Sequence, residues 1–196
     1  MLFDFDGVLL DSEPLHYACW AEAVNSLGIS ITWEQYEKHC IGFHDRDVMA
    51  FLASLAQSPV SVDAVRGCFA RKTGLFVRRA SQPGLISREL IGFLRSLSEY
   101  KLAVVTSSER AEIEPVLAAG GILGLFRSVV CAGDVARHKP APDPYLNAAE
   151  ALQAEEPLVV EDSELGVASA LAAGFDVVRV HGPDQVLSRV WERLAV

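Results

Sequence analysis

Short apolar runs alternate with helical patterns along most of this chain, and that alternation constrains its fold more than any other feature. The apolar runs are rich in β-branched residues and lie at 1–5, 102–107, 128–133, 157–162 and 176–180. Helical patterns separate the later runs, at 87–100, 110–121, 142–153 and 163–174. Three glycines, Gly120, Gly121 and Gly174, stand where such helices would end. Continuous apolar strands separated by helices predict an α/β fold with a parallel, Rossmann-like sheet covered on both faces.

The alternation stops between the first strand and the second. From Ser12 to Ser81 the sequence shows helical patterns at 12–28, 45–57 and 62–80 and no convincing strand. About 70 residues is too long for a simple crossover between parallel strands. We therefore predict two domains, a sheet-based core from residues 1–11 and 82–196 and an inserted helical module from residues 12–81.

The charge and composition exclude several kinds of partner. The formal net charge is −9, which disfavours nucleic acid and anionic membranes as partners. The sequence contains no apolar run of membrane-spanning length and no signal-like start. Its four cysteines lack metal-ligand spacing, and we interpret them as small buried hydrophobic residues in a reducing compartment: Cys19, Cys40, Cys68 and Cys131. We expect a cytoplasmic protein that is a monomer or a weak dimer.

Polar residues follow the predicted strands at the edge where parallel sheets bind ligands. They are acids, hydroxyls and one lysine: Asp4, Asp6, Thr106, Ser107, Lys139, Glu161 and Asp162. Asp4 and Asp6 interrupt an apolar run, where a bare carboxylate is costly unless its charge is offset. Oxygen donors without thiolates suit Mg²⁺, and Asp4 and Asp162 would then be ligands.

The same residue types suit phosphoryl transfer. A carboxylate held beside a phosphoryl group can attack phosphorus and form an aspartyl-phosphate. A second acid two residues along could protonate the leaving oxygen and later activate water. Lys139 and Thr106 would stabilise charge on the phosphoryl oxygens. The spacing of Asp4 and Asp6 fits these two roles.

Four segments resemble the four motifs of the haloacid dehalogenase-like (HAD) phosphohydrolases, in the family's order: "DFDGVLLDSEP", "VVTSS", "KPAPDPYL" and "VVEDSELGVASALAAG". The resemblance implies that Asp4 is the nucleophile and that Asp6 is the general acid and base, which also binds Mg²⁺ through its backbone carbonyl. It implies that Thr106, Ser107 and Lys139 bind phosphate, and that Asp162 is a metal ligand with Glu161 binding the metal or supporting its ligands. A helical cap after the first strand is typical of the sugar-phosphate phosphatase and β-phosphoglucomutase subgroup.

The sequence departs from the mutase pattern in the helical module. His16 and Lys72 are similar to substrate-contacting residues of the mutase, but the loop "GFHDRD" has Asp45 where the mutase has arginine. Arg46 stands one place later, and with His44 it is a further candidate for substrate selection. Only three residues precede Asp4, so the first strand should be short.

The leading interpretation is a Mg²⁺-dependent phosphatase that hydrolyses a small phosphorylated metabolite such as a sugar phosphate. A phosphosugar mutase would use the same core residues, and Asp45 favours hydrolysis over it. C–halogen hydrolysis is disfavoured because the dehalogenases lack a second aspartate equivalent to Asp6. A catalytically silent domain would be indicated by a lost motif residue, and none is missing. A response-regulator receiver would have its phosphorylated aspartate in mid-chain and would lack a cap.

Overall fold

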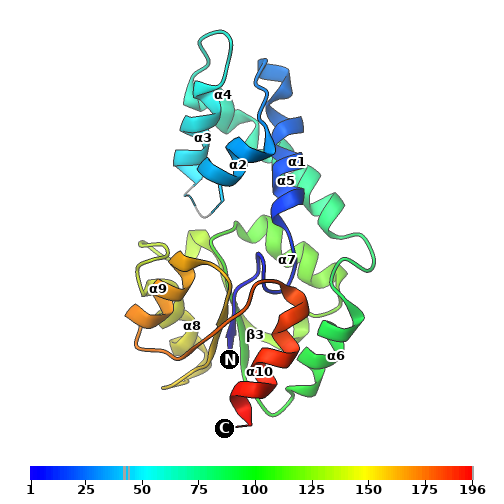
Figure 1. Ribbon diagram of the computed structural model, residues 1–196, viewed down its shortest axis with the longest axis vertical. Helices are drawn as coiled ribbons and strands as arrows, with labels where there is room; N and C mark the ends of the chain where they lie inside the picture. The colour runs from blue at the N-terminus through cyan, green and yellow to red at the C-terminus, as the bar shows by residue number, and fades with distance from the viewer. Residues whose placement is uncertain (42, 44, 196) are drawn as a thin grey trace. The chain divides into compact units, whose positions relative to one another are not determined.

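The computed structural model describes residues 1–41, 43 and 45–195, with the backbone alone for residues 45 and 46. It divides into two compact units (Figure 1). One unit consists of Met1–Asp11 together with Ser81–Val196 and contains the sheet. The other consists of Ser12–Ala80, and its regular elements are helices. We call them the sheet unit and the helical unit and describe each by itself.

A parallel sheet forms the centre of the sheet unit. Its strands lie in the order β3-β2-β1-β4-β5, with these bounds: β1 Leu2–Phe3, β2 Leu102–Val105, β3 Phe126–Val130, β4 Val159–Glu161 and β5 Val177–Arg179. In the central strand, Leu2 pairs with Ala103 on one side and with Val159 on the other. All four residues of β2 are buried, as expected for a strand covered on both faces. The first strand is short, yet it is the middle of the sheet.

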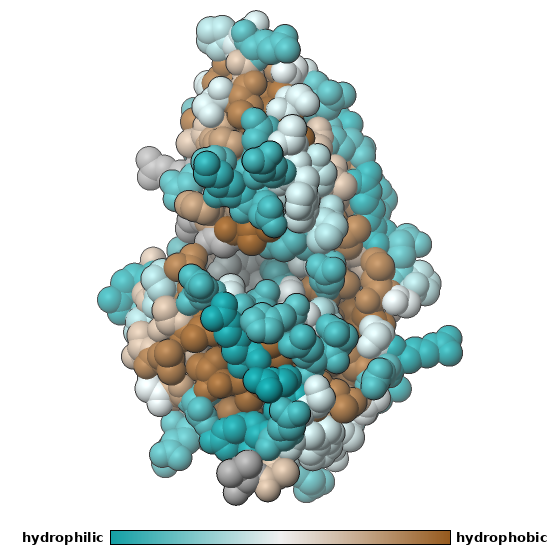
Figure 2. Space-filling model, viewed as in Figure 1, coloured by the Kyte–Doolittle hydropathy of each residue, from teal (hydrophilic) through white to brown (hydrophobic). Residues whose placement is uncertain are grey.

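Helices cover both faces of this sheet, with α8 and α9 on one side and α6 and α10 on the other (Figure 1). The helices of the sheet unit are α6 Arg88–Ser96, α7 Arg110–Ala119, α8 Asp143–Leu152, α9 Glu164–Ala172 and α10 Val186–Leu194. Single turns of 3-10 helix lie at Leu123–Leu125, Ala132–Asp134 and Pro183–Gln185. Helix α10 buries Val186 and Val190, and its outer surface is hydrophilic (Figure 2). This amphipathic pattern places α10 on the sheet.

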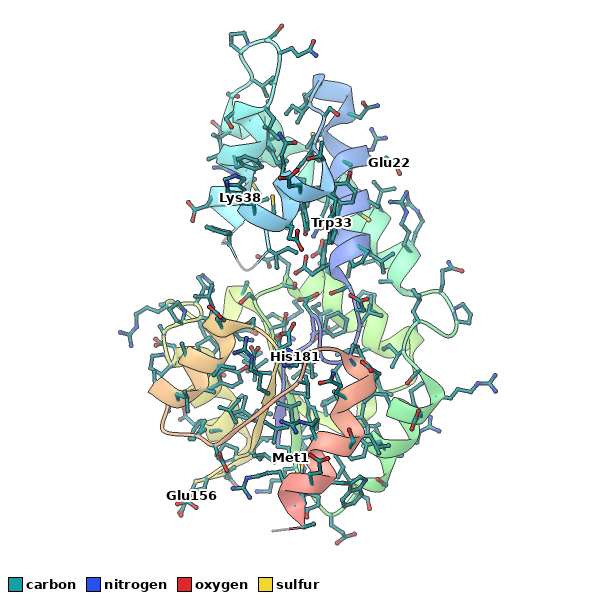
Figure 3. The ribbon with its side chains drawn as sticks, in the orientation of Figure 1. Met1, Glu22, Trp33, Lys38, Glu156 and His181 are labelled. Atoms are coloured by element: carbon teal, nitrogen blue, oxygen red, sulfur yellow. The ribbon has the colours of Figure 1, made fainter. Side chains whose placement is uncertain are left out.

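The helical unit has its own apolar core. Its helices are α1 Glu13–Val24, α2 Trp33–His39, α3 Asp45–Ser54, α4 Val62–Gly67 and α5 Phe69–Ala80, with a 3-10 turn at Asn25–Leu27. Helices α1 and α5 pack together, and Glu22, labelled in Figure 3, forms an ion pair with Arg79 across them. The core gathers aromatic and aliphatic residues that include Trp20, Tyr36 and Leu52. Full burial of one such side chain contributes about 1.5–3 kcal/mol to stability.

Most of the elements expected from sequence are present, with two differences in the helical unit. Helix α2 is absent from the expected helical patterns, although Thr32 and Gln35 form a capping box at its start. The pattern at 62–80 forms two helices rather than one, because the chain turns at Cys68 between α4 and α5. Of the predicted terminating glycines, Gly121 and Gly174 have φ of 65° and 81°, a conformation that favours glycine. Among the described residues, none of the helices has the length and apolar character needed to span a bilayer.

Candidate active site

The predicted polar residues of the core meet at the carboxyl ends of the three central strands. Asp4 follows β1, Thr106 follows β2, and Glu161 is the last residue of β4. These strands are neighbours in the order β2-β1-β4, and the Asp4 amide extends the pairing by donating to the Val160 carbonyl at 3.0 Å. Lys139 comes from the loop before α8. Sheet topology therefore brings together residues that lie more than 100 positions apart.

Lys139 forms the centre of the candidate site. Its Nζ donates to Asp4 Oδ1 at 2.8 Å, to Glu161 Oε1 at 2.7 Å and to the Val105 carbonyl at 3.1 Å. The Lys139 side chain is only 6% exposed, so these bonds form in surroundings that contain little water. Burial alone would lower the pKa of Lys139, but the charges of Asp4 and Glu161 outweigh it and hold that pKa well above its usual value. Lys139 is therefore a fixed cation beside Asp4.

Asp6 lies among the hydroxyls that follow β2. Its Oδ2 accepts from Ser108 Oγ at 2.8 Å and from Thr106 Oγ1 at 3.3 Å. The Ser108 amide in turn donates to Thr106 Oγ1 at 3.0 Å, and Ser107 between them is exposed. The sequence predicts phosphate-binding roles for Thr106 and Ser107 and none for Ser108. The alternation of side chains along extended backbone was the available signal, since it places residues 106 and 108 on one side.

Three carboxylates come close enough to share a cation. Asp4, Glu161 and Asp162 each offer an oxygen, and these oxygens lie within 4.8 Å of one another. Burial and the neighbouring acids raise the pKa of Asp4 well above its usual value, and burial and Glu161 raise the pKa of Asp162 to about 7. A divalent cation among them would offset this repulsion and favour their ionised forms.

Gly7 makes the room that this cluster needs. A Cβ atom at position 7 would lie 2.0 Å from Asp162 Oδ2, and the Gly7 φ of 76° also favours glycine. The Asp162 carboxylate therefore occupies space that any other residue at position 7 would fill. The donor set consists of carboxylate oxygens, with no thiolate among them, and so it fits Mg²⁺.

The helical unit contains two of the residues that were expected to contact substrate. His16 on α1 stacks on Phe76, with ring centroids 3.9 Å apart and an interplanar angle of 7°. The Nζ of Lys72 on α5 lies 5.4 Å from the same Phe76 ring and 5.8 Å from that of Trp20. His16 and Lys72 are thus buried together around one aromatic ring. His44 and the Arg46 side chain lie outside the described residues.

Comparison with known proteins matches residues 1–180 to the model of the family described as haloacid dehalogenase-like hydrolase. The fructose-1-phosphate phosphatase YqaB of Escherichia coli is 32% identical, over 92% of this chain and 95% of the relative. A phosphorylated carbohydrates phosphatase of Thermotoga maritima is 30% identical, over 93% of this chain and 83% of the relative. The crystal structure of CbbY from Rhodobacter sphaeroides in complex with phosphate superimposes with a TM-score of 0.75 at 25% identity, covering 92% of this chain and 85% of that one. The resemblance and fold class expected from sequence are thereby confirmed.

Proposed function

Since the chain belongs to the haloacid dehalogenase-like hydrolase family, we propose that it is a phosphatase that hydrolyses a small phosphorylated metabolite, with sugar phosphates as the substrate class. The carbohydrate-phosphate substrates in the names of the two bacterial relatives support that class. The observation that carries the proposal is the buried contact between Asp4 and Lys139 at the carboxyl edge of the sheet. It pairs a carboxylate able to attack phosphorus with a cation able to hold a phosphoryl oxygen.

In the proposed reaction an Asp4 oxygen attacks phosphorus, forming an aspartyl-phosphate while the bond from phosphorus to the substrate's ester oxygen breaks. The Asp6 carboxyl gives its proton to that leaving oxygen. Water then attacks the aspartyl-phosphate and passes a proton to Asp6, which releases inorganic phosphate and restores Asp4. Lys139, Thr106 and Ser107 bind the phosphoryl oxygens and hold them in place. Ser108 fixes Asp6 through its 2.8 Å hydrogen bond.

We propose that Mg²⁺ is held by Asp4, Asp162 and the Asp6 carbonyl. Glu161 binds the cation as well or supports these ligands. When bound, the cation would supply positive charge to the transferred phosphoryl group. The oxygen-only donor set and the space left by Gly7 support this assignment. We further propose that the helical unit is a cap that selects substrate through His16, Lys72 and Arg46. A cytoplasmic location stays a prediction, consistent with the four free cysteines of the described chain.

Replacing Asp162 with alanine should weaken Mg²⁺ binding by at least about tenfold, since even the partners of metal ligands typically contribute 10- to 100-fold. Calorimetric titration with MgCl₂ measures this directly and does not depend on turnover. The matched control is Asp63→Ala in the helical unit, which removes an exposed carboxylate paired with Arg66 and should leave Mg²⁺ affinity unchanged. Equal affinity in wild type and Asp162→Ala would contradict the proposed position of the cation.

Phosphate release from a panel of sugar phosphates and small phosphate esters, with Mg²⁺ and with chelator, tests the function. Release that requires Mg²⁺ and is confined to one or a few sugar phosphates is the expected result. Release from none of them by folded, Mg²⁺-binding protein would contradict hydrolysis. A mutase would then be tested by conversion of hexose 1-phosphates, and a protein inactive there as well would be a silent domain.

A further inference from the structure

Tyr145 is a buried polar residue that the proposed reaction does not use. It lies on α8, is fully buried in the core of the sheet unit, and donates its hydroxyl to Glu161 Oε1 at 2.9 Å. The Nζ of Lys139 lies 5.1 Å from the centre of its ring. Tyr145 therefore contacts Glu161 directly and lies beside the Lys139 ammonium that Glu161 binds.

Five hydrogen-bond donors hold the Glu161 carboxylate in one orientation. Oε1 accepts from the Tyr145 hydroxyl and Lys139 Nζ, whereas Oε2 accepts from Ser163 Oγ and from the Asp162 and Ser163 amides, all at 2.7–3.0 Å. A carboxylate has about four lone-pair sites, so these donors use its capacity in full. Turning the carboxylate would leave buried donors without acceptors, which is costly.

Gly166 supplies the space in which this carboxylate lies. A Cβ atom at position 166, in the first turn of α9, would lie 1.5 Å from Glu161 Oε1 and 2.5 Å from Oε2. The same helix is capped by Ser163, whose Oγ accepts from the Gly166 amide at 3.0 Å. Glu161 is thus enclosed by α9, and the hydrogen bond from the Tyr145 hydroxyl connects it to α8.

Lys139 depends on Glu161 in turn. Its three ammonium protons go to Asp4, Glu161 and the Val105 carbonyl, so a shift of Glu161 would move the ammonium relative to Asp4. Oε1 is shared between Lys139 and Tyr145. Without the Tyr145 hydroxyl, Oε1 would accept from the Lys139 ammonium alone. The ion pair between Glu161 and Lys139 would then be stronger and would compete with phosphate for the ammonium.

From this chain of contacts we propose that Tyr145 is a positioning residue, which acts through Glu161 to place Lys139 for phosphate binding. This inference rests on the proposed function. Phenylalanine at position 145 would keep the ring and its packing and would remove only the hydroxyl.

Tyr145→Phe should lower kcat/KM by about tenfold, the smaller loss typical of removing a partner of a site residue, with a rise in KM. Its affinity for inorganic phosphate should also fall. In a Glu161→Gln background the same substitution should have little further effect, because both changes interrupt the same contacts from Tyr145 through Glu161 to Lys139. The matched control is Tyr17→Phe, which loses a hydroxyl bonded at 3.2 Å to the Ile31 carbonyl and should behave like wild type.

The decisive readout is the ammonium NMR resonance of Lys139, identified by its loss in Lys139→Met. It should shift in Tyr145→Phe and stay in place in Tyr17→Phe. An unmoved resonance would overturn the inference. So would additive effects of the changes at positions 145 and 161 on kcat/KM. The resonance measurement does not depend on turnover. A wild-type protein that hydrolyses no phosphate ester would contradict the proposed function, whereas a shifted resonance would still support the role of Tyr145.

Discussion

Asp4→Asn should abolish turnover while leaving the fold intact. The amide has nearly the shape of the carboxylate, but it is a poor nucleophile towards phosphorus, so the aspartyl-phosphate cannot form. Removing a nucleophile typically lowers kcat by about 10⁴- to 10⁶-fold. Phosphate release from the best substrate of the panel measures the loss. Mass spectrometry of protein quenched during turnover should find a phosphoryl group on wild type and none on the variant.

The contacts of Asp4 explain why the variant should fold. Lys139 keeps its bonds to Glu161 and the Val105 carbonyl, and the asparagine oxygen can still accept the third. The neutral asparagine also removes the repulsion from Glu161, Asp6 and Asp162 that helps to raise the pKa of Asp4. Asp11→Asn, an exposed change in the same segment, is the matched control and should keep full activity. Appreciable activity in both Asp4→Asn and Asp4→Ala would remove Asp4 from the nucleophile's role.

The sheet could be predicted from the sequence because its strands lie in or beside apolar runs that no helix pattern fits, although β3 begins two residues before the predicted run and includes Arg127. The run ending in Val105 and the run ending in Glu161 are buried on both faces in the structure. The helical unit was harder to predict, since helix boundaries there depend on local caps and packing. The chain between 62 and 80 is amphipathic throughout, and only the three-dimensional structure shows that it turns at Cys68.

The site was predictable in its residue types and less so in its contacts. Strand order places Asp4, Thr106 and Glu161 at one edge, and the spacing of the motifs was enough to anticipate that. The pairing of Asp6 with Ser108 required the path of the chain after β2. The link from Tyr145 to Glu161 required the packing of α8 on the sheet, which no local pattern encodes.

Asp6→Asn should lower kcat by about 10²- to 10⁴-fold on sugar phosphates, the usual contribution of general acid–base catalysis. The variant cannot protonate the sugar oxygen as it leaves, nor can it take a proton from the attacking water. Its hydrogen bonds from Ser108 and Thr106 can be kept by the amide oxygen, so the local structure should survive. Steady-state phosphate release measures the overall loss.

The choice of substrate separates the two proton transfers. An aryl phosphate with an acidic leaving phenol needs little protonation, so Asp6→Asn should still form the aspartyl-phosphate on Asp4 from it. Hydrolysis of that intermediate still lacks its base, so rapid-quench experiments should show one fast burst of phenol followed by slow turnover. A sugar phosphate should give no burst, because its poor leaving group blocks the first step. Equal losses on both substrates, with no burst from the aryl phosphate, would mean that Asp6 supports the site without transferring the protons.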